Sequence, residues 1–182
     1  TCQGYGVMGS GWAVGPDTFV TNAHVVAGQD DTRIETNDGR SAPATPVAYN
    51  PRNDIAILRA DIDVPALPAL ARAQRGTAAA VIGYPNDGPL TITPARAGHT
   101  RLLLGDDAYG RGPFERLMLT LRGSVRHGNS GGPLVDGEGR VLGTVFAATT
   151  EGPPGGLAIP NRVLARISEK ASGQEVDTGT CA

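Results

Sequence analysis

The sequence lacks any run of about 18 apolar residues, so no segment of it is expected to cross a membrane as a helix. It also lacks an excess of charge. The formal net charge is −2 and 19% of the residues are charged, which argues against binding to nucleic acid or to an anionic membrane surface. No basic and apolar leader begins at Thr1, so we expect that a secretion signal is absent or lies outside this sequence.

Residues that bind metals or cofactors are equally scarce. The three histidines are scattered and the two cysteines lie far apart, so they form no ligand cluster. No phosphate-binding loop or dinucleotide fingerprint occurs either. We therefore expect neither a metal nor a cofactor.

The two cysteines, Cys2 and Cys181, lie close to the two ends of the chain. Two free thiols and a disulfide that joins the termini are both compatible with this placement. We favour the disulfide, which implies an oxidising compartment.

Glycine and proline are frequent, at 26 and 14 of 182 residues, which favours short strands joined by tight turns. Strand-like segments separated by turn sequences fall into two series. The first series is predicted at residues 9–14, 19–23, 44–49 and 55–59. The second is predicted at residues 78–83, 90–96, 118–121, 132–135, 141–147 and 157–159.

A stretch rich in alanine and proline, residues 64–76, separates the two series and is predicted to link two halves of one protease-sized domain, 1–182. The halves are then residues 1–63 and 77–160. Residues 105–113 are polar and glycine-rich, which predicts a surface loop. The end of the chain, 161–182, is predicted as a tail and a helix that starts at Asn161 as N-cap and ends near Ser172. Its apolar residues recur at helical spacing.

Ser130 stands in the sequence Gly128-Asn129-Ser130-Gly131-Gly132. A serine hydroxyl is a weak nucleophile unless a base removes its proton and the backbone exposes the oxygen. Glycines allow a sharp turn in which the backbone N–H groups of Gly128 and Ser130 point together at an oxyanion. We assign the oxyanion hole to residues Gly128, Asn129 and Ser130, although a plain glycine-rich hairpin is the alternative.

Two further residues suit a hydrolytic site. His24 follows Ala23 at the end of an apolar strand, and an imidazole titrates near neutral pH, as a general base should. Asp54 precedes the apolar segment 55–58, where a buried carboxylate needs a donor such as an imidazole N–H. A structural histidine and a turn-capping aspartate are the alternatives.

Together these residues, in the order His24, Asp54 and Ser130, resemble the triad of the chymotrypsin-like (trypsin-like) serine proteases. The resemblance runs from Gly9 to the helix after Asn161. It implies an all-β fold of two six-stranded antiparallel barrels with a short C-terminal helix. It also implies a serine endopeptidase that cleaves protein or peptide substrates.

Shorter motifs refine the resemblance. Residues 21–26, 128–132 and 156–160 resemble the HtrA/Deg branch. The opening residues 1–7, Gly-Tyr-Pro at 83–85, Thr-Pro-Ala-Arg at 93–96 and the closing Gly-Thr-Cys are similar to the membrane-anchored acid-resistance proteases of actinobacteria, the MarP family. This resemblance implies a periplasmic location, a membrane anchor before Thr1 and a role in stress or acid resistance. We expect this segment itself to be a monomer without membrane contact.

The chain departs from the digestive proteases at Asn129, where those enzymes carry an aspartate that pairs with a newly released N-terminus. The chain also does not open on an Ile-Val-Gly-Gly type sequence. We therefore expect other contacts to set the oxyanion loop, without cleavage at an activation site.

The resemblance also implies a specificity pocket with Ser124 at its base. Because no carboxylate stands there, we expect an uncharged pocket that favours apolar side chains. His127 is expected at the rim, either as an ordinary surface histidine or as a group whose protonation tunes binding. His99 is expected to have no role. The remaining pocket residues are predicted to be Val125, Phe146, Ala147, Ala148, Gly156 and Ala158.

Two alternatives to a general protease stay open at this stage. One is a latent pseudoprotease that binds a peptide or a partner, which the same fold permits. The other is a protease that mainly cleaves itself.

Overall fold

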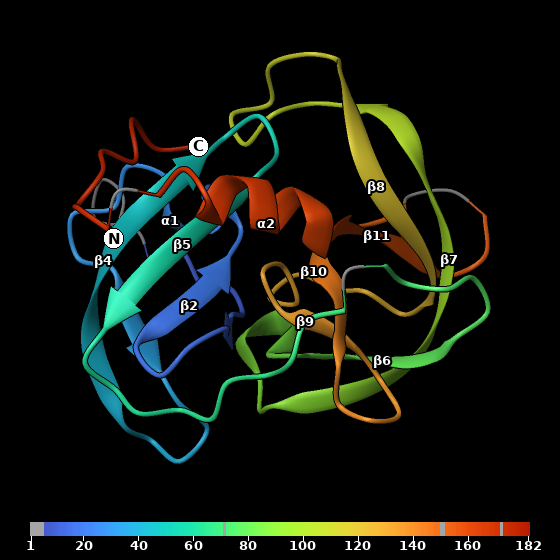
Figure 1. Ribbon diagram of the computed structural model, residues 1–182, viewed down its shortest axis with the longest axis horizontal. Helices are drawn as coiled ribbons and strands as arrows, with labels where there is room; N and C mark the ends of the chain where they lie inside the picture. The colour runs from blue at the N-terminus through green and yellow to red at the C-terminus, as the bar shows by residue number, and fades with distance from the viewer. Residues whose placement is uncertain (1–5, 71, 150–151, 172) are drawn as a thin grey trace.

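The computed structural model describes residues 6–70, 72–149, 152–171 and 173–182, and it contains two antiparallel β assemblies that lie side by side (Figure 1). The N-terminal strands form a sheet in the order β1-β2-β5-β4-β3. The C-terminal strands close into a barrel in the order β10-β11-β8-β7-β6-β9. The bounds of the first five strands are β1 Trp12–Ala13, β2 Thr18–Thr21, β3 Arg33–Glu35, β4 Ser41–Asn50 and β5 Ile55–Ala60. Those of the barrel are β6 Ala78–Gly83, β7 Thr91–Gly105, β8 Phe114–Gly123, β9 Pro133–Asp136, β10 Val141–Ala148 and β11 Gly155–Pro160.

The predicted all-β class and the six-stranded C-terminal barrel are confirmed. The N-terminal assembly differs from the prediction, since it has five strands among the residues that the structure describes. The residues just before β1 bond elsewhere: Ser10 N–H donates to Ser130 O at 2.8 Å, and Ser10 O accepts from Thr21 Oγ1 at 2.8 Å. This segment is therefore used to join the two assemblies.

Strands β7 and β8 extend well beyond the segments predicted for them. The extra residues of β7 pair with β8 from Thr100 to Gly105. Leu102 and Leu104 in this part are 59% and 71% exposed. The alternation of buried apolar and exposed polar residues that identifies a half-buried strand is therefore missing there.

A buried apolar cluster joins the sheet to the barrel. Trp12 and Ile55 of the sheet pack in one cluster with Val141 and Ile159 of the barrel. β5 lies between β2 and β4 in the sheet, and its residues Ile55, Ala56, Ile57 and Leu58 are all buried. Burial on both faces explains why the segment reads as a continuous apolar run.

Helix α2, Asn161–Ser168, packs against β4, β10 and β11 and so bridges both assemblies (Figure 1). Its N-cap residue is Pro160, so the prediction of Asn161 as N-cap was wrong. The buried Asn161 amide instead donates to Leu70 O at 2.8 Å and to Val141 O at 2.7 Å. The helix ends before the predicted Ser172, which lies outside the described residues. No helix in the described ranges is long and apolar enough to span a membrane.

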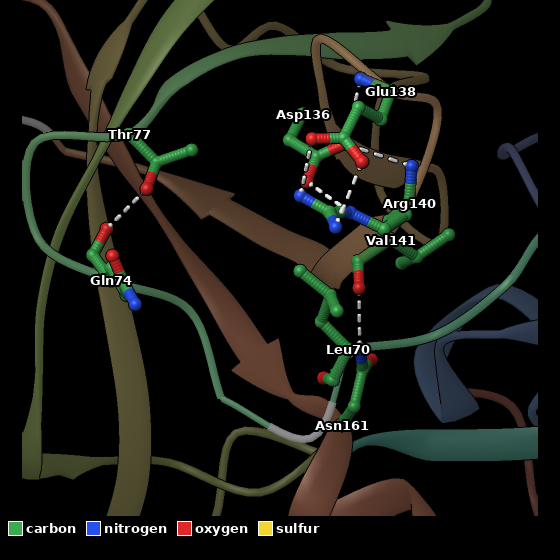
Figure 2. A network of polar contacts seen from close by, with 8 residues as sticks. All are labelled: Leu70, Gln74, Thr77, Asp136, Glu138, Arg140, Val141 and Asn161. Carbon is green, nitrogen blue, oxygen red and sulfur yellow. Dashed lines mark hydrogen bonds and ion pairs between the residues drawn. The ribbon is translucent and has the colours of Figure 1, made fainter.

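The segment between β5 and β6 runs along both assemblies. Leu67 N–H donates to Ala13 O at 2.9 Å, and Leu70 N–H donates to Val141 O at 2.9 Å. Figure 2 shows how Leu70, Val141 and Asn161 meet at the start of α2. This segment is therefore hydrogen-bonded to both assemblies.

A charged turn closes the β9–β10 hairpin (Figure 2). This hairpin follows the segment that contains Ser130. Asp136 accepts from the backbone N–H groups of Glu138 and Arg140 and from Arg140 Nε at 2.8 Å. Burial alone would raise the pKa of Asp136, but the donors of Arg140 and Glu138 outweigh it and lower that pKa. The turn is thereby held by an ionised carboxylate.

Candidate active site

His24 lies in a one-turn helix, α1 (Ala23–Val26), directly after β2. The sequence predicts a strand up to Ala23, but the strand ends at Thr21. The buried Asn22 comes next, and its side-chain amide donates to Asp54 O at 2.8 Å. That bond ties the start of α1 to the start of β5.

Asp54 is completely buried and contacts His24 through both carboxylate oxygens. Oδ2 lies 2.7 Å from His24 Nδ1, and Oδ1 accepts from the His24 backbone N–H at 2.8 Å. An ionised carboxylate is an acceptor only, so Nδ1 carries the proton and a neutral imidazole presents Nε2 as an acceptor. The pair therefore has the arrangement required of a base and the group that orients it.

The backbone of Asp54 is unusual, because its φ is +57°. Only a few residue types other than glycine adopt this region readily, and aspartate and asparagine are the main ones. A turn that starts at Pro51, with Asp54 N–H donating to Pro51 O at 3.2 Å, produces this conformation. It turns the carboxylate toward α1.

Ser130 lies in the turn between β8 and β9, and its hydroxyl donates to Phe146 O at 3.2 Å. The ring of Phe146 lies edge-on to the His24 ring, with centroids 6.5 Å apart. Phe146 therefore contacts both residues, Ser130 through its backbone carbonyl and His24 through its ring. Transfer of the Ser130 proton to His24 requires the hydroxyl to turn away from Phe146, as catalytic hydrogen bonds often tighten only with substrate bound.

The predicted oxyanion residues occupy a tight turn with Gly128 at φ +85°. Asn129 N–H donates to Arg126 O at 3.0 Å, so it is already used within the turn. Within the described part of the chain, no acceptor is found for the backbone N–H groups of Gly128 and Ser130. These two groups are the available donors for an oxyanion.

The predicted pocket residues lie on β10, on β11 and in the segment that follows β8. Ala148 pairs with Gly156, and a Cβ on Gly156 would lie 2.7 Å from a methyl group of Val125. Ala158 is fully buried in the barrel core, behind the surface that a substrate could reach. Ser124 and His127 are exposed. Ala147 is half-buried on β10 beside Phe146.

A buried cation next to the site was not anticipated from the sequence. Arg116 is 2% exposed, and its Cζ lies 4.5 Å from the centroid of the Phe146 ring. Burial lowers the pKa of the Arg116 guanidinium, while the charge of Asp54 opposes that change. The predicted strand started only at Met118, so nothing in the pattern marked Arg116 as inward-facing.

The remaining predicted residues lie outside this centre. Cys2 is outside the described residues, so its disulfide with Cys181 stays a prediction. The C-terminal tail packs near α1, since Gly28 N–H donates to Thr178 O at 3.2 Å. His99, on β7, is exposed and donates its backbone N–H to Thr120 Oγ1 at 2.9 Å. No group of three potential metal ligands occurs among the residues described.

A cavity of about 500 Å³ lies between β4 and α2, and Asn53, which precedes Asp54 in the sequence, is part of its lining. Its lining includes Val47, Tyr49, Val163 and Ile167. None of the three triad candidates lines this cavity.

Comparisons with known proteins show the family and the fold of the chain. A model of the trypsin-like peptidase domain matches residues 9–143. The serine protease Rv3671c of Mycobacterium tuberculosis is 39% identical over 181 residues, which cover 95% of this chain and 44% of that protein. A probable periplasmic serine endoprotease, DegP-like, of Chlamydia pneumoniae is 32% identical, covering 90% of this chain and 34% of its own length. The chain thus spans less than half of these relatives.

Two solved structures of the Rv3671c protease are similar to the whole fold. The active form has a TM-score of 0.89 at 39% identity and covers 95% of this chain and 78% of its own. The inactive form has a TM-score of 0.79 at 38% identity, with 90% and 83% covered. The expected chymotrypsin-like fold is confirmed by this similarity, as is the resemblance to mycobacterial and DegP-like proteases.

Proposed function

The chain belongs to the family of trypsin-like peptidase domains, and on this basis we propose that it is a serine endopeptidase with His24, Asp54 and Ser130 as its catalytic triad. One observation supports the triad above all others. A fully buried Asp54 carboxylate lies 2.7 Å from His24 Nδ1, which leaves the other ring nitrogen, Nε2, for a nucleophile. Such a carboxylate fixes the tautomer and stabilises the imidazolium that forms during acyl transfer.

The mechanism follows from the donors and acceptors present. Ser130 Oγ attacks the scissile carbonyl carbon while His24 Nε2 takes its proton. The N–H groups of Gly128 and Ser130 donate to the oxyanion of the tetrahedral intermediate. His24 then protonates the leaving amine, and water hydrolyses the acyl-enzyme on Ser130 by the same route in reverse. Asp54 stays ionised throughout.

Substrate choice is proposed to depend on an uncharged pocket. Ser124, the base of the pocket by family resemblance, carries no charge. Val125, Ala147 and Gly156 are proposed as walls, and a Cβ on Gly156 would lie 2.7 Å from a methyl group of Val125 and 2.8 Å from Ala147 O. A substrate cation buried there would lack a partner, which is costly. We therefore expect cleavage after apolar side chains.

The proposal extends to the location of the protein. Several relatives are named periplasmic endoproteases, which favours an extracytoplasmic site of action. A disulfide between Cys2 and Cys181 suits such a compartment. A membrane anchor before Thr1 and a role in acid or stress resistance complete the proposal by resemblance to the MarP family.

One observation favours the latent alternative: the Ser130 hydroxyl bonds to Phe146 O. The greater similarity to the active form of the mycobacterial protease than to the inactive form weighs against it. The active and the latent alternatives differ in whether the Ser130 hydroxyl reacts with a substrate or a fluorophosphonate.

The test is hydrolysis of casein by the wild type and by Ser130→Ala at several pH values, together with labelling by a fluorophosphonate. We expect the wild type to cleave casein and take up the label, and the variant to do neither. An unlabelled and inactive wild type that is folded by circular dichroism would overturn the proposal in favour of a binding module. Cleavage that survives in Ser130→Ala would overturn the assignment of the nucleophile.

A further inference from the structure

The oxyanion turn is contacted by a hydroxyl from the other half of the molecule. Ser10, just before β1, is 4% exposed. Its Oγ donates to Gly128 O at 2.6 Å and accepts from Tyr84 N–H at 3.0 Å. One side chain thus connects the N-terminal sheet, the β6–β7 connection and the turn that precedes Ser130.

A second bond to the same turn comes from the β6–β7 connection. Asn86 N–H donates to His127 O at 2.7 Å. The carbonyl of His127 and the N–H of Gly128 belong to one planar peptide and point in opposite directions. Holding the carbonyl against Asn86 therefore directs the Gly128 N–H away from Asn86, and among the described residues this N–H has no acceptor, which leaves it available to an oxyanion.

The packing between these segments leaves little freedom. A Cβ on Gly128 would overlap Tyr84 O, and a Cβ on Gly83 would lie 2.6 Å from Ser10 Oγ. Asn86 has a φ of +53°, a conformation that asparagine tolerates, and this turns its N–H toward His127. The carbonyls on both sides of Gly128 N–H, those of His127 and Gly128, are therefore each fixed by one donor.

We infer that Ser10 is a positioning residue for catalysis: its hydroxyl holds the β6–β7 connection against the oxyanion turn and so keeps the Gly128 N–H directed at the substrate carbonyl. This inference rests on the proposed function and deepens it. In the digestive proteases the aspartate at the position of Asn129 pairs with a new N-terminus and supports the oxyanion turn. Here the bond from Ser10 to Gly128 O supports the turn instead.

The test compares Ser10→Ala with a matched control, Thr144→Val. Thr144 is buried, and its Oγ1 accepts from Trp12 Nε1 at 3.2 Å, so it too supplies one side-chain hydrogen bond between the two assemblies. It makes no contact with the oxyanion turn among the bonds of the described residues. Both variants are expected to lower the thermal midpoint, but only Ser10→Ala is expected to lower kcat, by about tenfold, with KM within about twofold.

Two readouts separate positioning from a general loss of stability. A peptide aldehyde, which binds as a tetrahedral adduct, should bind Ser10→Ala weaker by about the same factor as kcat falls. Backbone hydrogen exchange of residues 84–88 and 126–131 should accelerate in Ser10→Ala and stay unchanged in Thr144→Val. Equal kcat, aldehyde affinity and exchange in Ser10→Ala and wild type would overturn the inference. An inactive wild type would overturn the proposed function and with it the catalytic role of Ser10, and accelerated exchange in Ser10→Ala would then support only that Ser10 orders the turn.

Discussion

Replacing Asp54 by asparagine isolates the charge of the buried carboxylate from its shape. Asparagine has nearly the same size and tolerates the φ of +57° that Asp54 adopts, whereas alanine would add backbone strain of about 1–2 kcal/mol. The side-chain oxygen of asparagine can still accept one of the two hydrogen bonds that His24 supplies. The lost charge-assisted bond costs at most about 3 kcal/mol of stability.

The catalytic effect should be much larger than the effect on stability. If the asparagine NH2 faces Nδ1, the imidazole proton moves to Nε2, and His24 can no longer accept the proton of Ser130. Loss of the correct tautomer and of the imidazolium's counter-charge is expected to lower kcat about 10⁴-fold, or about 5.5 kcal/mol in the barrier.

The assay is steady-state hydrolysis of a fluorogenic peptide, with chemical unfolding measured in parallel. Asp136→Asn is the matched control, since it removes another buried aspartate with an ionic partner, on the β9–β10 turn. We expect kcat of the control to stay within about twofold of wild type. A kcat for Asp54→Asn within tenfold of wild type, in a variant that unfolds cooperatively, would refute the triad assignment.

Two further predictions concern the pocket and the charged turn. A peptide library should show cleavage after apolar residues, and Ser124→Asp should raise the relative rate for arginine at least about tenfold; an arginine preference in the wild type would contradict the uncharged pocket. Asp136→Asn should lower the free energy of unfolding by about 2 kcal/mol at pH 7. Because the folded state lowers the pKa of Asp136, its stabilisation is present above the unfolded value of about 3.9 and is lost as the pH falls through the folded pKa. The stabilities of wild type and variant should thus converge as the pH falls below the unfolded value, and a gap that does not narrow with falling pH would contradict this account.

The chemistry of the site was accessible from the sequence because each candidate lies in a short local motif. His24 follows the end of an apolar strand, and Asp54 precedes another, so the contact between them needs only that β2 and β5 be neighbours. The pairing of Thr21 with Ala56 provides that contact. The roles of these residues in catalysis are still proposals, and their proximity was expected from the resemblance to the protease family, since the strand pattern alone does not show that β2 pairs with β5.

The contacts that surround the site were not accessible in the same way. Ser10 and Gly128 are 118 residues apart in sequence, and a buried serine has no pattern that sets it apart from an exposed one. Arg116 was missed because the predicted strand began at Met118, four residues after the observed start of β8 at Phe114. Local preference predicts Asn161 as a helix cap, but its side-chain amide donates to two backbone carbonyls of other segments. Local rules fail where a side chain satisfies a distant part of the backbone.

The oxyanion turn is held both by local hydrogen bonds and by bonds from distant segments, and this affects how the enzyme becomes active. Locally, Asn129 closes the turn on itself, since its Oδ1 accepts from Arg126 N–H at 2.9 Å and its N–H donates to Arg126 O at 3.0 Å. That reciprocal pair fixes the shape of the turn but not its direction relative to the substrate. The direction depends on Ser10 and Asn86, which come from the sheet and from the β6–β7 connection. All of these bonds form within the folded chain without a charged N-terminus. An enzyme built in this way gains its oxyanion donors when the two assemblies dock, so its activity should track the docking of the halves and not cleavage at an activation site.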